Sequence, residues 1–171
     1  IEVAGHANRT DYDLKAHQKG SSVEMSVLRK DGTRFVPHVI EPSYGLDRLT
    51  FVAMESAYEL KETTKEKRTI FRFPRKLAPY QVSIQPLVTK DGLPEKAMTV
   101  YDTVLAEGFR AVFDDGGSIG RRYARQDEVG TPLAVTVDYT TMEKGILTIR
   151  ERDSWQQVTL YVDDLPEKLH A

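Results

Sequence analysis

The chain has 171 residues, enough for one domain with its own core, or for one domain and part of another. Its formal net charge is −2, which excludes a general nucleic-acid binder with a strongly basic surface, so any RNA contact needs a local basic patch. The absence of cysteine excludes disulfides, thiol catalysis and cysteine-ligated metals, and no apolar run is long enough to cross a bilayer.

The first 40 residues have the pattern of short strands. Ile1 to Ala4 resemble the end of a buried strand, and because no initiator methionine precedes them we interpret the chain as a piece of a longer protein. Residues 6–20 are polar, with Asp11-Tyr12-Asp13-Leu14 at their centre. The runs 23–28 and 35–40 are strand-like, and Lys30-Asp31-Gly32-Thr33 between them is a turn signal, so a hairpin is expected.

A helix is expected next. Pro42 suits a first helical turn, where its missing N–H costs nothing. Apolar residues then recur every three or four positions, which is typical of a helix; they are Leu46, Leu49, Ala53, Ala57 and Leu60. The charged run from Lys61 to Arg68 predicts a solvated connection.

From residue 73 onward, strand and helix patterns alternate. Strands are expected at 80–88, 110–113, 133–139, 146–150 and 157–162, and helices at 94–107, 118–128 and 165–170. Alternation favours parallel pairing in the first half of this region. The predicted fold class is α/β: a mixed β-sheet flanked by helices, preceded by an antiparallel β region and a helix.

The junction after residue 40 could hold a ligand. A strand would bring Glu41 and Ser43 to the edge of a sheet, and Gly45 would let a ligand approach the backbone. Arg48, one helical turn on, is a planar cation suited to a phosphate or a purine face. The alternative is an ordinary helix start, with a carboxylate favoured by the helix dipole and a surface Asp47–Arg48 pair.

A glycine-rich turn precedes the second helix of the later region. Gly116 to Gly120 fits the G-x-S-x-G pattern of hydrolases, but the only later histidine is His170 at the extreme end, so a catalytic triad is a poor fit. A phosphate-binding loop with Arg121 and Arg122 is the better functional interpretation. The alternative is a flexible turn into a charged helix.

Arginines gather on two elements of the same region. Arg121 and Arg125 share a helix face, and Arg150 and Arg152 share a strand face. With Tyr139 they suit unpaired bases, which stack on rings and guanidinium planes. The alternative is that neighbouring acids neutralise these arginines. The four histidines lack metal-like spacing, so no metal site is expected.

Residues 37–48 resemble the third signature motif of class II aminoacyl-tRNA synthetases, in the form found in the archaeal and eukaryotic glycyl enzymes. Residues 1–14 resemble the strand and loop before that motif. Residues 78–80, 114–115, 118–130 and 150–154 resemble the anticodon-binding domain of that family. The segment 20–34 is shorter than the eukaryotic insertion, so the archaeal type is the better match.

The resemblance implies four sets of site residues. Arg9 and Arg48 would be catalytic, and the ATP-binding set is Glu2, Val3 and Arg48. The glycine-binding set is Glu41, Ser43 and Gly45, with Glu41 facing the ammonium group. The anticodon-binding set is Arg121, Arg122, Tyr139, Arg150 and Arg152.

The resemblance also implies the organisation and partners. Residues 1–60 would be part of the catalytic domain, 61–72 a connection and 73–171 the anticodon-binding domain. The parent, a cytoplasmic homodimer, would join glycine to tRNA-Gly using ATP with Mg²⁺. Without the first two class II motifs, the chain alone is expected to be inactive and to bind no cofactor tightly.

Two rival assignments remain. One is a non-catalytic, synthetase-like accessory module that binds nucleic acid; the presence of Glu41, Ser43 and Arg48 favours the ligase. The other is a different class II synthetase, which the Glu41-Pro42-Ser43 context disfavours.

Overall fold

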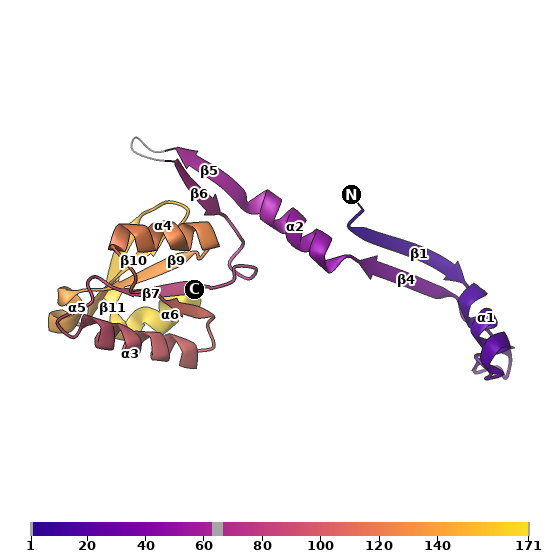
Figure 1. Ribbon diagram of the computed structural model, residues 1–171. Coiled ribbons are helices and arrows are strands. Elements are labelled where there is room, and N and C mark those ends of the chain that lie inside the picture. Colours follow the sequence, from indigo (N-terminus) through magenta and orange to yellow (C-terminus); the bar gives the residue numbers. More distant parts are fainter. Residues whose placement is uncertain (1, 63–66, 171) are drawn as a thin grey trace. The chain divides into compact units, whose positions relative to one another are not determined.

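The computed structural model describes residues 2–62 and 67–170 (Figure 1). The chain divides into two compact units, Ile1–Val52 and Ala53–Ala171, which are treated separately below. Within the described residues, no helix is both long and apolar enough to span a membrane.

The first unit is built on two antiparallel strands. β1 (Ala4–Thr10) pairs with β4 (Val39–Tyr44), with Ala7 opposite Glu41. The expected hairpin is confirmed, although its strands β2 (Val27–Leu28) and β3 (Arg34–Phe35) are only two residues long. Pro42 lies in β4 rather than in a helix, a position that a strand with a single partner tolerates.

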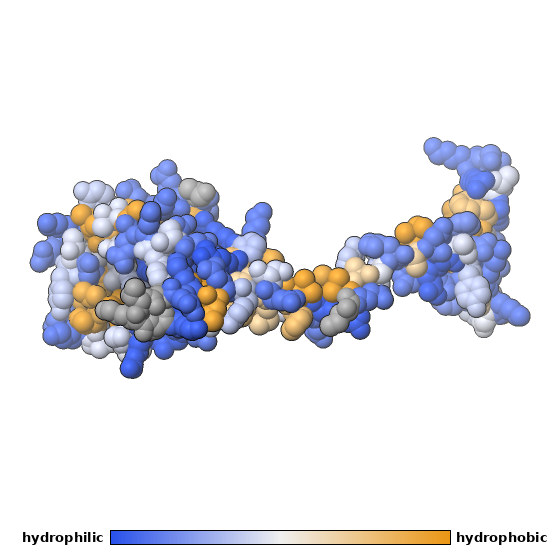
Figure 2. Space-filling model, turned by 90° about the horizontal axis from the view of Figure 1, so that it is seen from above, coloured by the Kyte–Doolittle hydropathy of each residue, from blue (hydrophilic) through white to orange (hydrophobic). Residues whose placement is uncertain are grey.

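A helix in the first unit was not predicted. α1 (Tyr12–Ser21) buries none of its residues and has no apolar stripe, which is why periodicity gave no signal. Its first turn is held instead by ion pairs four residues apart, Lys15 with Asp11 and Arg9 with Asp13. The next helix, α2 (Leu46–Ala57), confirms the predicted spacing up to Ala57, and Figure 2 shows apolar atoms along it. Leu60, which was expected in the same helix, lies in the strand that follows.

The charged run after α2 contains strands. β5 (Tyr58–Glu62) and β6 (Lys67–Phe71) form an antiparallel ladder where a solvated connection was expected. The pattern is inverted from the usual one, because the apolar Tyr58 and Leu60 are exposed while Glu59 and Lys61 are half-buried. Glu59 pairs with Arg72, and Lys61 lies over the ring of Trp155, so the run could not be identified from its hydrophobicity.

The main sheet of the second unit has five strands in the order β11-β10-β9-β7-β8. β7 runs parallel to both β8 and β9, as alternation predicted, and β10 is antiparallel to β9 and β11. The strands are β7 (Val82–Pro86), β8 (Ala111–Phe113), β9 (Leu133–Val137), β10 (Ile146–Glu151) and β11 (Gln157–Tyr161). The main helices are α3 (Leu93–Ala106), α4 (Ile119–Val129) and α6 (Leu165–His170), the last preceded by a 3-10 turn, η1 (Val162–Asp164).

A short helix, α5 (Tyr139–Lys144), begins at the residue that was predicted to end a strand, and the rest of it was not predicted. Asp138 and Thr141 form a capping box at its start, and Gly145 ends it in the left-handed conformation. These signals are local, and six residues are too few to show a helical period.

The two faces of the sheet differ in chemistry. One face is apolar and packs with α3 and α6 around Ile84, Val135 and Leu147. The other carries the buried polar side chains of Ser83, Gln85, Thr136 and Arg150. α4 covers this polar face, as Figure 1 shows, and its own fully buried residues are also polar; they are Arg122, Gln126 and Asp127.

Gly130, which ends α4, gives a test of this packing. It has φ +88°, and a Cβ there would lie 2.6 Å from Cδ2 of Phe73 and 2.9 Å from the carbonyl oxygen of Phe71. We expect Gly130→Ala to lower the free energy of unfolding by about 3 kcal/mol, combining left-handed strain with overpacking.

Gly145→Ala is the matched control. Its φ is +69°, but no atom lies within 4 Å of the added Cβ, so strain alone should cost about 1 kcal/mol. Urea unfolding of both variants measures the difference. Equal losses would contradict the close packing of the 71–73 segment on α4.

Candidate functional site

Arg122 holds the loop between β8 and α4, residues 114–118, in place through hydrogen bonds. This side chain is 2% exposed. Its guanidinium donates to the backbone oxygens of Asp115 and Gly117, both at 2.7 Å, and also to that of Pro86 at the end of β7. Arg122 therefore joins the glycine-rich turn, the helix and the central strand, and its charge is directed into the protein.

Asp114, the first residue of the same loop, is hydrogen-bonded to α4. It accepts hydrogen bonds from Arg125 at 2.8 and 2.9 Å, from the side chain of Gln126 at 3.2 Å and from the backbone of Gly116. Burial opposes ionisation of this carboxyl group, but the hydrogen bonds outweigh it and hold the pKa of Asp114 below its usual range. The start of α4 is thus fixed by two charged residues.

Arg121 and Tyr139 are the exposed members of the predicted RNA-binding set. Within the described part of the chain, Arg121 makes no hydrogen bond or ion pair, and it stands in the first turn of α4. Tyr139 is 43% exposed and donates to Oδ2 of Asp91 at 2.6 Å, a bond that raises the pKa of the phenol. Both side chains present their surface to solvent.

Arg150 forms a buried ion pair with α4. Its two terminal nitrogens lie 2.8 and 2.9 Å from the two carboxylate oxygens of Asp127, and both side chains are more than nine-tenths buried. The guanidinium also lies 4.9 Å from the ring centre of Tyr123. The pair is bidentate, which fixes the angle between helix and strand as well as their separation.

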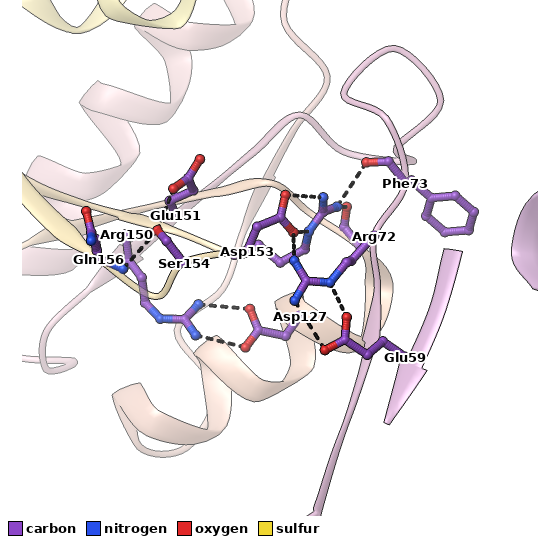
Figure 3. A network of polar contacts seen from close by, with 11 residues as sticks. Glu59, Arg72, Phe73, Asp127, Arg150, Glu151, Asp153, Ser154 and Gln156 are labelled. Atoms are coloured by element: carbon purple, nitrogen blue, oxygen red, sulfur yellow. Dashed lines mark hydrogen bonds and ion pairs between the residues drawn. The ribbon is translucent and has the colours of Figure 1, made fainter. Parts of the chain in front are cut away.

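Arg152 belongs to a second network, of which Figure 3 labels Glu59, Arg72, Phe73 and Asp153. It donates to the backbone oxygens of Gly130 at 2.8 Å and Phe73 at 3.1 Å, and to the carboxylate of Asp153. Asp153 also pairs with Arg72, which in turn binds Glu59 of β5. Hydrogen bonding by Arg152 lowers the pKa of Asp153 despite partial burial. This network ties the β5–β6 ladder to the end of α4.

Three arginines are neutralised by acids, as the alternative interpretation of the sequence proposed. Arg150 pairs with Asp127, Arg152 with Asp153, and Arg125 with Asp114. Arg122 is held by backbone oxygens instead. Asp114 and Gln126 were not predicted as loop anchors, because only the fold brings the end of β8 to the middle of α4.

The first unit brings the predicted ATP-binding residues together. Arg48 donates from Nη1 to the backbone oxygen of Glu2 at 2.6 Å, and the N–H of Gly45 donates to the oxygen of Val3 at 3.1 Å. A Cβ on Gly45 would lie 3.3 Å from Cδ of Arg48, so glycine leaves room for the arginine. All four residues lie at the same end of the β1–β4 ladder.

Further along this ladder, Arg9 lies between two carboxylates. Its Nη2 donates to Oδ1 of Asp13 at 2.8 Å, and its Nε lies 3.4 Å from Oε2 of Glu41. The hydrogen bond from Arg9 lowers the pKa of Asp13. Ser43, opposite Gly5, is exposed. Across residues 2–62 and 67–170, no three His, Cys, Asp or Glu residues are grouped so that they could hold a metal ion.

Comparison with known proteins gives consistent matches. Residues 81–171 match the anticodon binding domain family. The chain is 51% identical over 139 residues to a glycine–tRNA ligase of Aeropyrum pernix, covering 81% of the chain and 23% of that protein. It is 41% identical over 174 residues to the glycine–tRNA ligase of Thermobifida fusca, covering 98% of the chain and 37% of that protein. The glycine–tRNA ligase of Clostridium kluyveri is 42% identical over 168 residues. The chain thus spans about a quarter to just over a third of these relatives.

The buried Asp127–Arg150 pair generates a stability prediction. We expect Asp127→Ala to lower the free energy of unfolding by about 3–5 kcal/mol, because Arg150 would stay buried without its carboxylate. Urea unfolding followed by the fluorescence of Trp155, the only tryptophan, measures this in the second unit.

The exposed pair Glu62–Lys67 provides the control, since Glu62→Ala should cost less than about 1 kcal/mol. Adding Arg150→Met to Asp127→Ala should restore much of the stability. A small loss for Asp127→Ala alone would show that the pair does not hold α4.

Proposed function

The chain belongs to the anticodon-binding domain family through residues 81–171 and is homologous to part of the glycine–tRNA ligases, and from this we propose that it binds the anticodon of tRNA-Gly. The observation that carries the proposal is the family match over 81–171, in the same region where α4 presents an exposed arginine. The domain would extend over residues 73–171, with 61–72 as its connection to a catalytic part in 1–60.

The RNA-facing residues are proposed to be Arg121 and Tyr139. A guanidinium without a protein partner can donate to O2 and N3 on the Watson–Crick edge of an anticodon cytosine, and it can also stack on the base. An exposed ring offers a stacking surface for a splayed base. The first turn of α4 adds the positive end of the helix dipole to the same place.

Arg122, Arg150 and Arg152 are proposed to support the site by fixing the backbone around it. Their guanidinium groups are bound to backbone oxygens and carboxylates in the free protein. Each therefore fixes the position of α4, its loop or the turn after β10 before RNA arrives. A backbone that is already ordered in the free protein lowers the entropic cost of binding RNA.

The residues of the first unit are proposed to serve the chemical step. Glu41 would receive the ammonium group of glycine with Ser43 and Gly45 nearby, and Arg9 lies beside it. Arg48, with Glu2 and Val3, would hold ATP.

In the parent enzyme, the glycine carboxylate would attack the α-phosphate and release pyrophosphate; the tRNA terminal hydroxyl would then attack the carbonyl carbon and release AMP. Positive charge on the phosphates and positioning are what this chemistry needs. Mg²⁺ would arrive with ATP. The parent is proposed to be an archaeal-type homodimer.

Binding of two transcripts tests the anticodon assignment. We expect the chain to bind a glycine tRNA transcript more tightly than one with its anticodon cytosines replaced, at one fixed salt concentration. Arg121→Gln should weaken binding to the first transcript by about 1–3 kcal/mol and reduce the difference between the two. Lys168→Gln, on α6, is the control and should change neither. Equal binding of both transcripts by the unaltered chain would refute anticodon reading.

Tyr139 gives an independent test, because stacking needs its ring and not its hydroxyl. Tyr139→Phe removes the bond to Asp91 and should keep the affinity, whereas Tyr139→Leu should lose about 1–3 kcal/mol of binding. Fluorescence anisotropy of the labelled transcript measures both. Equal losses in the two variants would show that the hydroxyl–Asp91 bond, rather than stacking, matters.

A further inference from the structure

Asp115 is an exposed acid in the loop between β8 and α4, next to the anchoring residue Asp114. The carboxylate of Asp114 is bound by Arg125 and Gln126. The carboxylate of Asp115, in contrast, makes no hydrogen bond or ion pair within the part of the chain that the structure describes. Its backbone oxygen accepts from Nη2 of Arg122 at 2.7 Å. The backbone of Asp115 is therefore fixed, while its side chain is available to a ligand.

Arg121, the exposed arginine proposed above to contact RNA, lies against the same loop. A Cβ on Gly117 would lie 3.8 Å from Cδ of Arg121, so the stem of this arginine passes beside the loop. Arg122 also donates to the backbone oxygen of Gly117 at 2.7 Å, which holds the loop on both sides of residue 116. Asp115 and Arg121 form no ion pair with each other, so the loop presents one free acceptor group and one free donor group.

The topology places this loop at the ligand-binding edge of the sheet. β7 and β8 are parallel neighbours, but α3, which follows β7, packs on the apolar face, whereas α4, which follows β8, covers the polar face. Open α/β sheets bind ligands at the carboxyl ends of such strands, where the connections leave on opposite faces. Asp115 comes directly after β8, and Tyr139 comes directly after β9, the other parallel neighbour of β7. Asp115, Arg121 and Tyr139 therefore lie at one edge of the sheet.

The charges at the loop favour the edge of a base over a phosphate. A phosphate would accept from Arg121, but the carboxylate of Asp115 would repel it. The Watson–Crick edge of cytosine carries both kinds of group, because its N4 amino group donates while N3 and O2 accept. An ionised aspartate only accepts and an arginine only donates. Asp115 and Arg121 together are therefore complementary to cytosine.

We propose that Asp115 is a specificity-determining residue, which accepts a hydrogen bond from the N4 amino group of one anticodon cytosine while Arg121 donates to N3 and O2. The proposal rests on the anticodon binding proposed above and deepens it, because it assigns a residue to the choice between cytosine and uracil. Uracil has an oxygen in place of the N4 amino group, and the carboxylate of Asp115 would repel that oxygen. Selectivity then comes from rejection of uracil as well as from attraction of cytosine.

The test measures Kd for the glycine tRNA transcript and for transcripts in which each anticodon cytosine in turn is replaced by uracil, at one fixed salt concentration. We expect Asp115→Asn to reduce the preference for cytosine over uracil by about 10-fold at one anticodon position, because an asparagine amide can accept from N4 or donate to O4. The preference is a ratio of two Kd values, so any general gain in RNA affinity from the loss of a negative charge cancels.

Asp102→Asn, which changes an exposed acid on α3, is the matched control and should leave every ratio as it is in the unaltered chain. If the unaltered chain prefers cytosine and Asp115→Asn keeps that preference in full at every position, the proposal is overturned while anticodon reading stands. The same holds if Asp115→Asn weakens binding of all transcripts by one factor, which is the result of a purely structural role. Equal binding of all transcripts by the unaltered chain would refute anticodon reading itself, and this proposal with it.

Discussion

The position of α4 depends on a polar layer between this helix and the sheet. Most helices pack through an apolar stripe, whereas α4 buries the polar residues Arg122, Gln126 and Asp127. Asp127 pairs with Arg150, Arg122 donates to backbone oxygens, and Tyr123 shares a hydrogen bond with Thr136 of the sheet. Apolar contacts tolerate sliding, but a bidentate pair such as Asp127–Arg150 has one good geometry. The layer therefore defines where the first turn of α4 lies, and with it Arg121 and the glycine-rich loop.

The two faces of the sheet have different roles: one provides most of the stability, and RNA recognition is proposed for the other. The apolar face, with α3 and α6, provides the core, and hydrophobic burial there stabilises the unit. The polar face contributes less net stability, because desolvating charges opposes their attraction. This polar face holds buried arginines close to solvent-exposed ones. The β5–β6 ladder contacts the same side of the unit through the Arg72–Asp153 ion pair and through Lys61, which lies over the ring of Trp155. Recognition of an anionic partner is proposed for this side.

Much of the fold followed from the sequence, because the five strands and three main helices of the second unit have strong periodic or turn signals. α5 was missed, since its evidence is a capping box and a glycine rather than a period. The β5–β6 ladder was missed because its charged side chains face inward to partners that are distant in sequence. Strand alternation correctly placed Arg150 on a defined face, but only the fold shows that Asp127 lies opposite. Exposure, which separates Arg121 from Arg122, is likewise a property of packing.

The most direct test of this account is hydrogen–deuterium exchange of the chain with and without the glycine tRNA transcript. If α4 defines the RNA-binding side, amides in the loop before α4 and at the start of α5 should gain protection on binding. Amides of α3 and α6, on the other face of the sheet, should not change. Protection confined to α3 and α6 would contradict the account, as would tight binding with no change near α4.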